Sequence, residues 1–222
     1  MDNPLNNATG ASLVSPPELQ QALASLSRGV YTREASLEMM LVILTESVGQ
    51  MCGIGRVSIW ALSDDRQELR CLDMYDCTTG RHGKGQCIQA AQYPAYFEAL
   101  GEGAVISADD ALHHPLTTGF GVDCLLHQRA TAFLDTPIHV RGELQGMLCM
   151  EQVSTRQPWG SAYHLFAQAV ANLITLALVQ YEACEAHLEA HAAGERLRTV
   201  YDAVREALSD ASDWRQVPNL TL

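Results

Sequence analysis

Residues 130–153 read ATAFLDTPIHVRGELQGMLCMEQV. Apolar residues fill both halves of this stretch, and Arg141-Gly142-Glu143 at its centre is a turn sequence. Two strand-like runs joined by a turn of this length predict an antiparallel β-hairpin. Pro137 lacks the N–H group that a ladder hydrogen bond needs, so we expect that part of the first strand to lie at an edge or to be irregular.

A second hairpin is predicted further upstream in the chain. Residues 56–62 and 68–75 alternate between apolar and polar side chains, which is the period of a strand with one buried face. The polar residues 63–67 between them form the connection. Residues 104–107 predict one more strand.

Helical patterns flank these strands on both sides. A serine, two prolines and a glutamate at residues 15–18 predict a helix start, and a second apolar helix is expected from about Thr32 to near Gly53. After residue 158, apolar side chains recur every three or four positions to about residue 211. Gly194 interrupts this pattern and predicts a bend, a break or a weak point. Strands between helices predict an α+β fold, in which helices pack on a sheet.

Charge and composition exclude several classes of protein. The 14 Lys and Arg against 26 Asp and Glu give a net charge of −12, which disfavours a nucleic-acid partner. No uninterrupted apolar run reaches the roughly 18 residues of a membrane helix, and the N-terminus lacks an export signal. The seven cysteines form no C-x-x-C pair, as is usual for reduced thiols. We expect a soluble, cytoplasmic protein without a membrane partner.

The region between the two hairpins is long and has little regular structure. Residues 76–129 carry one short helical pattern at residues 94–100 and the strand at 104–107. Loops of this length inside a domain are usually functional. We therefore expect this region to line any ligand pocket.

Several segments of the chain together resemble one known family. They are residues 56–60 (RVSIW), 68–76 (ELRCLDMYD), 93–100 (YPAYFEAL), 108–117 (ADDALHHPLT), 133–138 (FLDTPI) and 146–151 (GMLCME). The fourth is similar to a D-A-x-x-D-P-R-T pattern, from which His114 and Leu116 depart. The order and spacing of these segments over about residues 30–180 resemble a GAF domain, the small-molecule-sensing module of bacterial sensor kinases and GGDEF/EAL cyclic-dinucleotide enzymes.

The resemblance implies an architecture for the whole chain. It is a GAF/PAS-like α+β domain, with a central antiparallel sheet of five or six strands. The terminal helices pack on one face, and a loop-rich ligand pocket lies on the other. We expect residues 1–15 to be a flexible arm, residues 16–180 to form the GAF domain with its N-terminal helices, and residues 181–222 to form a signalling and dimerisation helix with a tail.

A small-molecule pocket needs apolar walls and a few polar groups that orient the ligand. The candidate ligand-binding residues are Tyr75, Cys87, Tyr93, Tyr96, Phe97, Asp109, His113, Phe120, Cys124, Arg129, Thr131, Phe133 and Met150. The alternative is that the aromatic side chains only fill the space between sheet and loops. The ligand, and whether any cofactor is bound, is not identifiable from the sequence.

Two special kinds of GAF site are disfavoured by the residues themselves. His113, His114, Cys124 and His127 lack the two tight pairs of a structural zinc site, so we expect no metal. Bilin-binding relatives carry a histidine directly after the attachment cysteine, whereas Leu125 follows Cys124.

An enzymatic reading remains open beside the sensory one. The chain could resemble free methionine sulfoxide reductase, a GAF protein that attacks with a cysteine thiolate. Cys77, Cys87 and Cys124 lie in the loop region, and Lys84 is close in sequence to the first two. The long terminal helices argue against a stand-alone reductase. No catalytic residue is assigned, and we expect a regulatory domain rather than an enzyme.

The terminal helices indicate self-association. Beyond residue 180 no predicted strand remains to cover the apolar stripe, which favours a homodimer joined through paired helices. The candidate interface residues are Leu19, Leu23, Leu173, Tyr181, Cys184, Leu188 and His191. Such a dimer would relay ligand binding to an output domain or to another signalling protein. A dimerisation module without any ligand is the remaining alternative.

Overall fold

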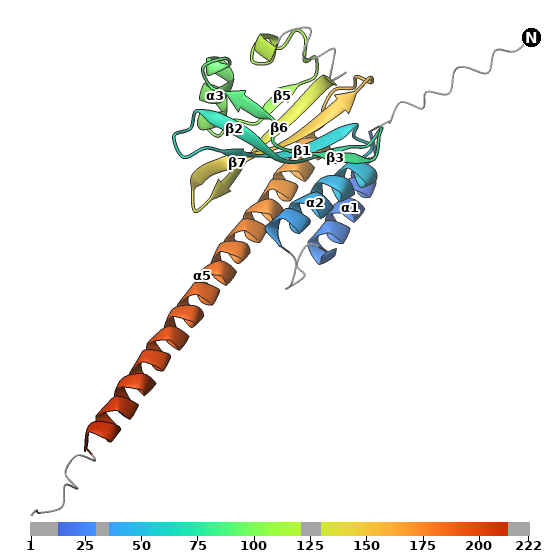
Figure 1. Ribbon diagram of the computed structural model, residues 1–222. Coiled ribbons are helices and arrows are strands. Elements are labelled where there is room, and N and C mark those ends of the chain that lie inside the picture. The colour runs from blue at the N-terminus through green and yellow to red at the C-terminus, as the bar shows by residue number, and fades with distance from the viewer. Residues whose placement is uncertain (1–12, 30–35, 121–129, 213–222) are drawn as a thin grey trace, which may run out of the picture. The chain divides into compact units, whose positions relative to one another are not determined.

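The computed structural model describes residues 13–29, 36–120 and 130–212 (Figure 1). The chain divides into two compact units, Met1–Val179 and Gln180–Leu222. The first unit holds the sheet and every described helix except the C-terminal part of the last one. The second unit holds the rest of that helix.

The first unit is built around one antiparallel sheet. Its strands are β1 (Arg56–Leu62), β2 (Glu68–Asp76), β3 (Arg81–Gly83), β4 (Cys87–Gln89), β5 (Ile106–Ala108), β6 (Ala130–Val140) and β7 (Glu143–Val153). The strand order is β3-β2-β1-β7-β6-β5, and β4 pairs with β2 next to β3. The antiparallel α+β fold is confirmed, with seven strands where five or six were expected. The short strands β3 and β4 have three residues each, too few for a periodic pattern to reveal them.

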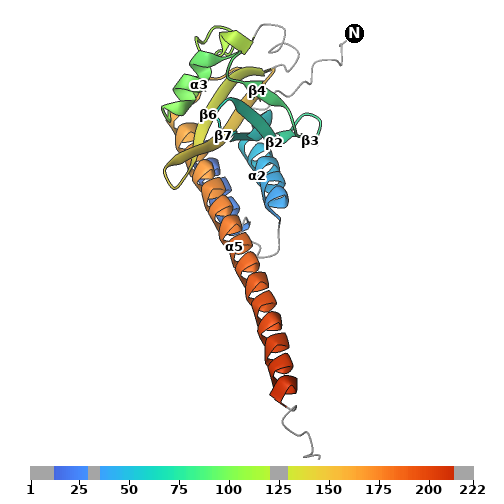
Figure 2. The same ribbon diagram turned by 60° about the vertical axis from the view of Figure 1, so that its left-hand side comes forward.

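Helices and loops lie on opposite faces of this sheet. The helices α1 (Pro16–Gly29) and α2 (Leu37–Cys52), together with the first part of α5 (Ser161–Ser212), cover one face. The helix α3 (Pro94–Gly101) and the segments around β4 and β5 lie over the other face (Figures 1 and 2). This arrangement is the one that the family resemblance implies.

Local chemistry explains where the first helices begin and end. At α1, Glu18 accepts hydrogen bonds from both the N–H and the hydroxyl of Ser15, at 2.8 and 2.7 Å. At α2, the Ser36 hydroxyl accepts from the Met39 N–H at 3.2 Å, so the helix begins at Leu37 rather than near Thr32. Gly53 ends α2 in the left-handed conformation, with φ of 63°.

The β6–β7 hairpin forms as predicted, with one difference at Pro137. Arg141 and Gly142 have φ of 53° and 85°, which is the geometry of a tight two-residue hairpin turn. β6 is an interior strand, because β5 and β7 flank it. However, β5 pairs only with Phe133 to Asp135, so Pro137 lies where β6 has a neighbour on one side only.

The helix α5 begins at Ser161 and continues through Gly194 without a break. Over residues 161–203 it is, among the described helices, the one long and apolar enough to cross a membrane, because its most apolar 18-residue window has a mean hydropathy of 1.5. A mean over a window tolerates single polar residues, so the helix meets it although polar residues interrupt its apolar runs. Within the protein, 44% of its most apolar window is buried, and Val170, Ile174 and Ala177 are fully covered. Such burial is typical of a helix that packs in a domain core.

Candidate ligand-binding site

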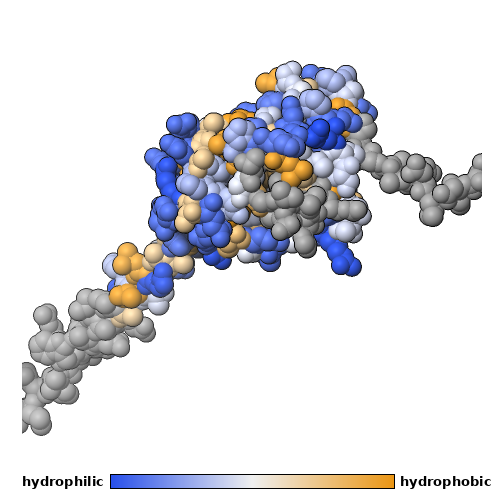
Figure 3. Space-filling model, turned by 90° about the horizontal axis from the view of Figure 1, so that it is seen from above, coloured by the Kyte–Doolittle hydropathy of each residue, from blue (hydrophilic) through white to orange (hydrophobic). Residues whose placement is uncertain are grey.

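A cavity of about 400 Å³ lies over the sheet face opposite to α2. Strands β1, β2, β6 and β7 form its floor, and β4, α3 and the short 3-10 helix η1 (Thr118–Phe120) contribute its walls. Figure 3 looks down from above, and hydrophobic side chains are visible there between hydrophilic ones. A volume of this size is within the range of small-molecule sites in proteins.

The strand register brings three charged side chains together on the floor. Arg56 on β1 lies opposite Asp76 on β2 and opposite Glu151 on β7. The Arg56 guanidinium is 2.7 Å from a Glu151 carboxylate oxygen and 3.6 Å from an Asp76 carboxylate oxygen. Burial raises the pKa of Glu151, although the Arg56 charge opposes this shift. The three residues form an ion-pair network at one end of the cavity, in which Arg56 and Glu151 are buried and Asp76 is partly exposed.

The next row of the register carries a fourth charged side chain. Cys149 on β7 lies opposite Asp135 on β6. Asp135 is 2% exposed, and its Oδ2 accepts a hydrogen bond of 2.7 Å from the Tyr96 hydroxyl. Its Oδ1 has no hydrogen-bond partner among the residues that the structure describes. Burial raises the pKa of Asp135 to about 6.

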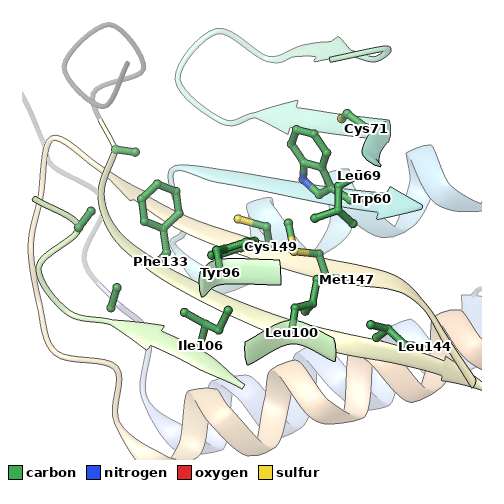
Figure 4. Packing of buried hydrophobic residues seen from close by; sticks show 13 residues of the cluster. Trp60, Leu69, Cys71, Tyr96, Leu100, Ile106, Phe133, Leu144, Met147 and Cys149 are labelled. Atoms are coloured by element: carbon green, nitrogen blue, oxygen red, sulfur yellow. Dashed lines mark hydrogen bonds between the residues drawn. The ribbon is translucent and has the colours of Figure 1, made fainter. Parts of the chain in front are cut away.

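Aromatic rings form the walls above these groups. The Phe120 ring centroid lies 4.5 Å from that of Tyr93, 5.2 Å from that of Tyr96 and 6.4 Å from that of Phe133. Figure 4 shows Phe133, Tyr96 and Trp60 on the same side of the sheet. The Trp60 Nε1 donates to the Ser58 hydroxyl at 2.8 Å, which fixes the orientation of the indole. The cavity therefore combines an aromatic wall with a charged floor.

Five of the candidate ligand-binding residues line this cavity. They are Cys87, Tyr93, Tyr96, Phe120 and Phe133. Phe97 does not line it, but its ring centroid lies 6.2 Å from that of Tyr96, and it packs against the cluster of buried hydrophobic side chains that includes Tyr96 and Phe133. Cys124 and Arg129 lie outside the described residues.

Two strand residues were assigned to the wrong face. The Tyr75 hydroxyl accepts a hydrogen bond from Gln50 Nε2 of α2 at 3.3 Å, so this ring lies on the helix-covered face. Met150 is fully buried, and it alternates along β7 with Cys149 and Glu151, which line the cavity. Because successive side chains of a strand point to opposite faces, Met150 faces the helices.

Three loop and strand residues have other roles than lining the cavity. Asp109 Oδ1 accepts from the Trp159 N–H at 2.8 Å, and thereby fixes the segment that leads into α5. The Thr131 hydroxyl donates to the backbone carbonyl of Gln152 at 2.9 Å. His113 is exposed and lies 2.9 Å from Asp110. The first two side chains thus join backbone segments that are distant in sequence, and the third contacts a neighbouring loop side chain.

The polar groups that do line the cavity were missed. They include Arg56, Asp76, Asp135 and Glu151, all on strands rather than in the loops. The strand period could have identified Asp135, because it comes two residues after the candidate Phe133 and shares its face. Glu151 could not be found in this way, because the candidate on its strand was Met150, which faces the opposite side. In the described part of the chain, no group of three or more His, Cys, Asp or Glu side chains is placed to hold a metal ion.

Comparisons with known proteins identify the family of this fold. The GAF domain family model matches residues 36–178. The search of curated proteins finds no match. The GAF domain of a phosphoenolpyruvate-protein phosphotransferase from Coxiella burnetii has 16% identity and a TM-score of 0.63, covering 78% of this chain and 99% of that one.

Two other solved structures were determined with a bound small molecule. The phycoerythrobilin-bound GAF domain of a cyanobacterial phytochrome has 16% identity and a TM-score of 0.64, covering 77% of this chain and 100% of that one. Free methionine-R-sulfoxide reductase from Neisseria meningitidis, in complex with its substrate, has 12% identity and a TM-score of 0.60, covering 78% and 99%. These likenesses support the fold, and the family model covers most of the sheet domain. The chain belongs to the GAF domain family.

Proposed function

We propose that this GAF domain binds a small organic molecule in the cavity over β1, β2, β6 and β7 and acts as a sensory, regulatory domain. The observation that carries the proposal is the buried Asp135 carboxylate, which lines an aromatic cavity and keeps one oxygen without a partner among the described residues. Buried polar groups in proteins are nearly always hydrogen-bonded, so a bound molecule would complete this one. Similar folds with a bilin or a substrate bound support the proposal.

Ligand binding has a short route to the helices. Arg56 and Glu151 lie on the cavity floor, close to the ends of the strands that connect to helices. α2 ends at Cys52, four residues before Arg56, and the Cys52 carbonyl accepts a hydrogen bond of 2.7 Å from the Tyr163 hydroxyl of α5. A ligand that favours one arrangement of the floor would thereby bias the packing of α2 against α5.

We further propose that the helix after residue 180 pairs with the same helix of a second chain. Among the described residues of this unit, Leu188, Leu197 and Tyr201 expose 58%, 74% and 66% of their surface. Tyr181 is half-buried, and Cys184 and His191 are exposed. Tyr181, Cys184, Leu188 and His191 recur every three or four residues and so share one face of α5, whereas Leu197 and Tyr201 lie on another face. Apolar side chains at this spacing are what a coiled-coil partner covers. The homodimer would relay the signal to an output domain or partner protein of a bacterial pathway.

Two of the candidate interface residues cannot serve as proposed. Leu19 is 3% exposed and Leu173 is 9% exposed, because both pack inside their own chain. Leu23 is half-buried on α1. The apolar seam of α5 up to Val179 is occupied by the sheet domain, whereas Leu176 on the same stretch is 56% exposed.

A thiol enzyme is the less favoured function. Burial raises the pKa of Cys52 and Cys71 to about 12 and that of Cys77 to about 11. Cys87, which lines the cavity, also has a raised pKa because of partial desolvation and the nearby Glu68 carboxylate. A catalytic thiolate needs a lowered pKa, so these four thiols do not fit a reductase. We also propose that the protein is cytoplasmic, which accords with the free thiols of these cysteines. The net charge of −12 accords with a partner other than nucleic acid.

Native mass spectrometry of the purified full chain tests the ligand proposal. We expect a retained small molecule on the wild-type protein, and its loss from Ile88→Trp, because Ile88 lines the cavity and the larger indole would fill it. The matched control is Met39→Trp, which adds the same indole at a position that is 55% exposed on α2. Equal retention by all three proteins would place the molecule elsewhere, and a wild-type protein without any retained molecule would contradict the proposal.

A further inference from the structure

The charges around the cavity do not balance among the described residues. Three lining side chains are acids, Asp76, Asp135 and Glu151, and one is a base, Arg56. The base is engaged by two of the acids, at 2.7 Å from Glu151 and 3.6 Å from Asp76. Asp135 has no described cation as a partner. A second anion placed here would be repelled, and a cation would be attracted.

The surroundings of Asp135 leave one hydrogen-bonding position open. The Tyr96 hydroxyl of α3 occupies Oδ2 at 2.7 Å. The other titratable groups that face Asp135 are Cys149 and Glu151 of β7. Cys149, whose Sγ donates to Glu151 Oε1 at 3.6 Å, lowers the pKa of Asp135 by less than burial raises it. The Glu151 carboxylate and a negative charge on Asp135 repel each other. Oδ1 is buried in the cavity wall without a described donor. A buried carboxylate oxygen without a hydrogen bond costs free energy, whereas an exposed one is hydrogen-bonded by water. A ligand group that donates to Oδ1 is therefore strongly favoured.

The aromatic walls suit the same kind of ligand. Tyr96, Phe120 and Phe133 surround this part of the cavity, with ring centroids 5.2 and 6.4 Å from that of Phe120. Ring faces attract cations and also bury flat apolar groups. Met147 adds a polarizable wall, and its sulfur lies 3.1 Å from the Tyr96 hydroxyl oxygen.

From these observations we infer that the cavity binds a cationic organic molecule, a protonated amine attached to an aromatic or similarly flat group, with the amine donating to Asp135 Oδ1. This inference rests on the proposed ligand-binding function and narrows it to a chemical class. The volume of about 400 Å³ accommodates an arylalkylamine. Arg56 and Glu151 would then lie beside the ligand, and their ion pair would stay intact.

Three phenols with the same ring and a similar two-carbon side chain separate the effect of charge from that of the aromatic group. They are tyramine, which is a cation, 4-ethylphenol, which is neutral, and 3-(4-hydroxyphenyl)propionate, which is an anion. Titration calorimetry with the full chain is expected to show tyramine binding at least about tenfold more tightly than 4-ethylphenol, and the anion not binding. A charge-assisted hydrogen bond is worth enough to produce such a ratio.

The variant Asp135→Asn keeps the shape of the side chain and removes its charge. It is expected to weaken tyramine binding about tenfold and to leave 4-ethylphenol binding unchanged. The matched control Glu143→Gln removes one negative charge outside the cavity, from a side chain that is 69% exposed, and should leave both affinities unchanged. Circular dichroism of each variant verifies that it is folded.

Several results would overturn the inference. They are no binding of tyramine to the wild-type protein, equal binding of tyramine and 4-ethylphenol, or unchanged tyramine binding by Asp135→Asn. The wild-type comparison needs no variant and therefore stands even if Asp135→Asn fails to fold. A retained molecule that mass spectrometry identifies as neutral or anionic would overturn the ligand class and leave the sensory function intact.

Discussion

The ionised carboxyl of Asp135 is proposed to bind the ligand, and its burial lowers the free energy of unfolding of the protein. The Asp135 carboxyl has a pKa of about 6 in the folded protein, against 3.8 for an unperturbed group, because burial removes it from water and outweighs the hydrogen bonds of Cys149 and Tyr96, which lower the pKa. The folded state therefore binds the proton more tightly than the unfolded state does. The stability that this protonation contributes is fully present below about pH 4 and is lost as the pH rises through about 6.

The loss of stability with rising pH gives a prediction for Asp135→Asn, which cannot ionise. The free energy of unfolding of the variant should exceed that of the wild type by an amount that grows between pH 4 and pH 7, by up to about 3 kcal/mol. Urea unfolding at several pH values measures this difference, and other titrating groups cancel in it. A difference that stays constant over this range would mean that Asp135 is not the buried, poorly solvated carboxyl that the structure shows.

At the scale of single residues, the sequence predicted the apolar side of the site better than the polar side. Tyr96, Phe120 and Phe133 were expected in the pocket because large aromatic side chains in a long loop region have few other places to go. The polar candidates Asp109 and Thr131 instead bond the backbone near the entry to α5. Which polar residue points into a cavity depends on tertiary register, which a loop sequence does not specify.

At the scale of elements, the contact between β1 and β7 depends on Gly146. Gly146 lies opposite Ala61, and a Cβ atom at this position would overlap the carbonyl oxygen of Trp60 and lie 3.0 Å from its carbonyl carbon. The backbone of a central strand cannot move away without breaking its ladder. Trp60 also lines the cavity, so this close approach connects the sheet to the site.

Gly146→Ala is therefore expected to destabilise the protein by about 3 kcal/mol or more. The matched control is Gly160→Ala, because a Cβ atom there would meet nothing within 4 Å. Thermal unfolding of both variants measures the effect. A melting temperature of Gly146→Ala equal to that of the control would contradict the observed pairing of β1 with β7.

Both long hairpins could be predicted from the sequence, because their runs are long, apolar and joined by clear turns. The start of α2 and the place of Pro137 in the sheet were less predictable. α2 begins at Leu37, after the N-cap Ser36, rather than near Thr32. Pro137 is accommodated by the shortness of β5 rather than by an edge position. Both outcomes depend on side-chain bonds and on neighbouring strands, which lie outside the local sequence pattern.

At the scale of the whole molecule, self-association is the main prediction. Leu188→Asp places a charge on the helix face that carries Tyr181, Cys184 and Leu188, and it is expected to shift a dimer towards monomer in analytical ultracentrifugation. The control is Leu112→Asp, at a position that is 38% exposed in the loop after β5. Wild-type protein that sediments as a monomer, or an equal effect of both variants, would contradict the paired-helix proposal.

Heptad spacing predicted an apolar seam along α5 but could not tell which part of it the sheet covers. Leu173 belongs to that seam and is buried in its own chain, whereas Leu188 belongs to it and is 58% exposed. Leu173 lies in the first unit and Leu188 in the second. The apolar spacing of the sequence does not mark the boundary between them.

The occupancy of the cavity is tested most directly by the methionine methyl groups. Met74 and Met147 line the cavity, whereas Met39 and Met51 are exposed elsewhere on α2. Carbon-13 methyl spectra are compared between protein as purified and protein that has been unfolded, dialysed and refolded to remove small molecules. The account predicts that the Met74 and Met147 signals shift while those of Met39 and Met51 do not. Unchanged signals from Met74 and Met147 would contradict it.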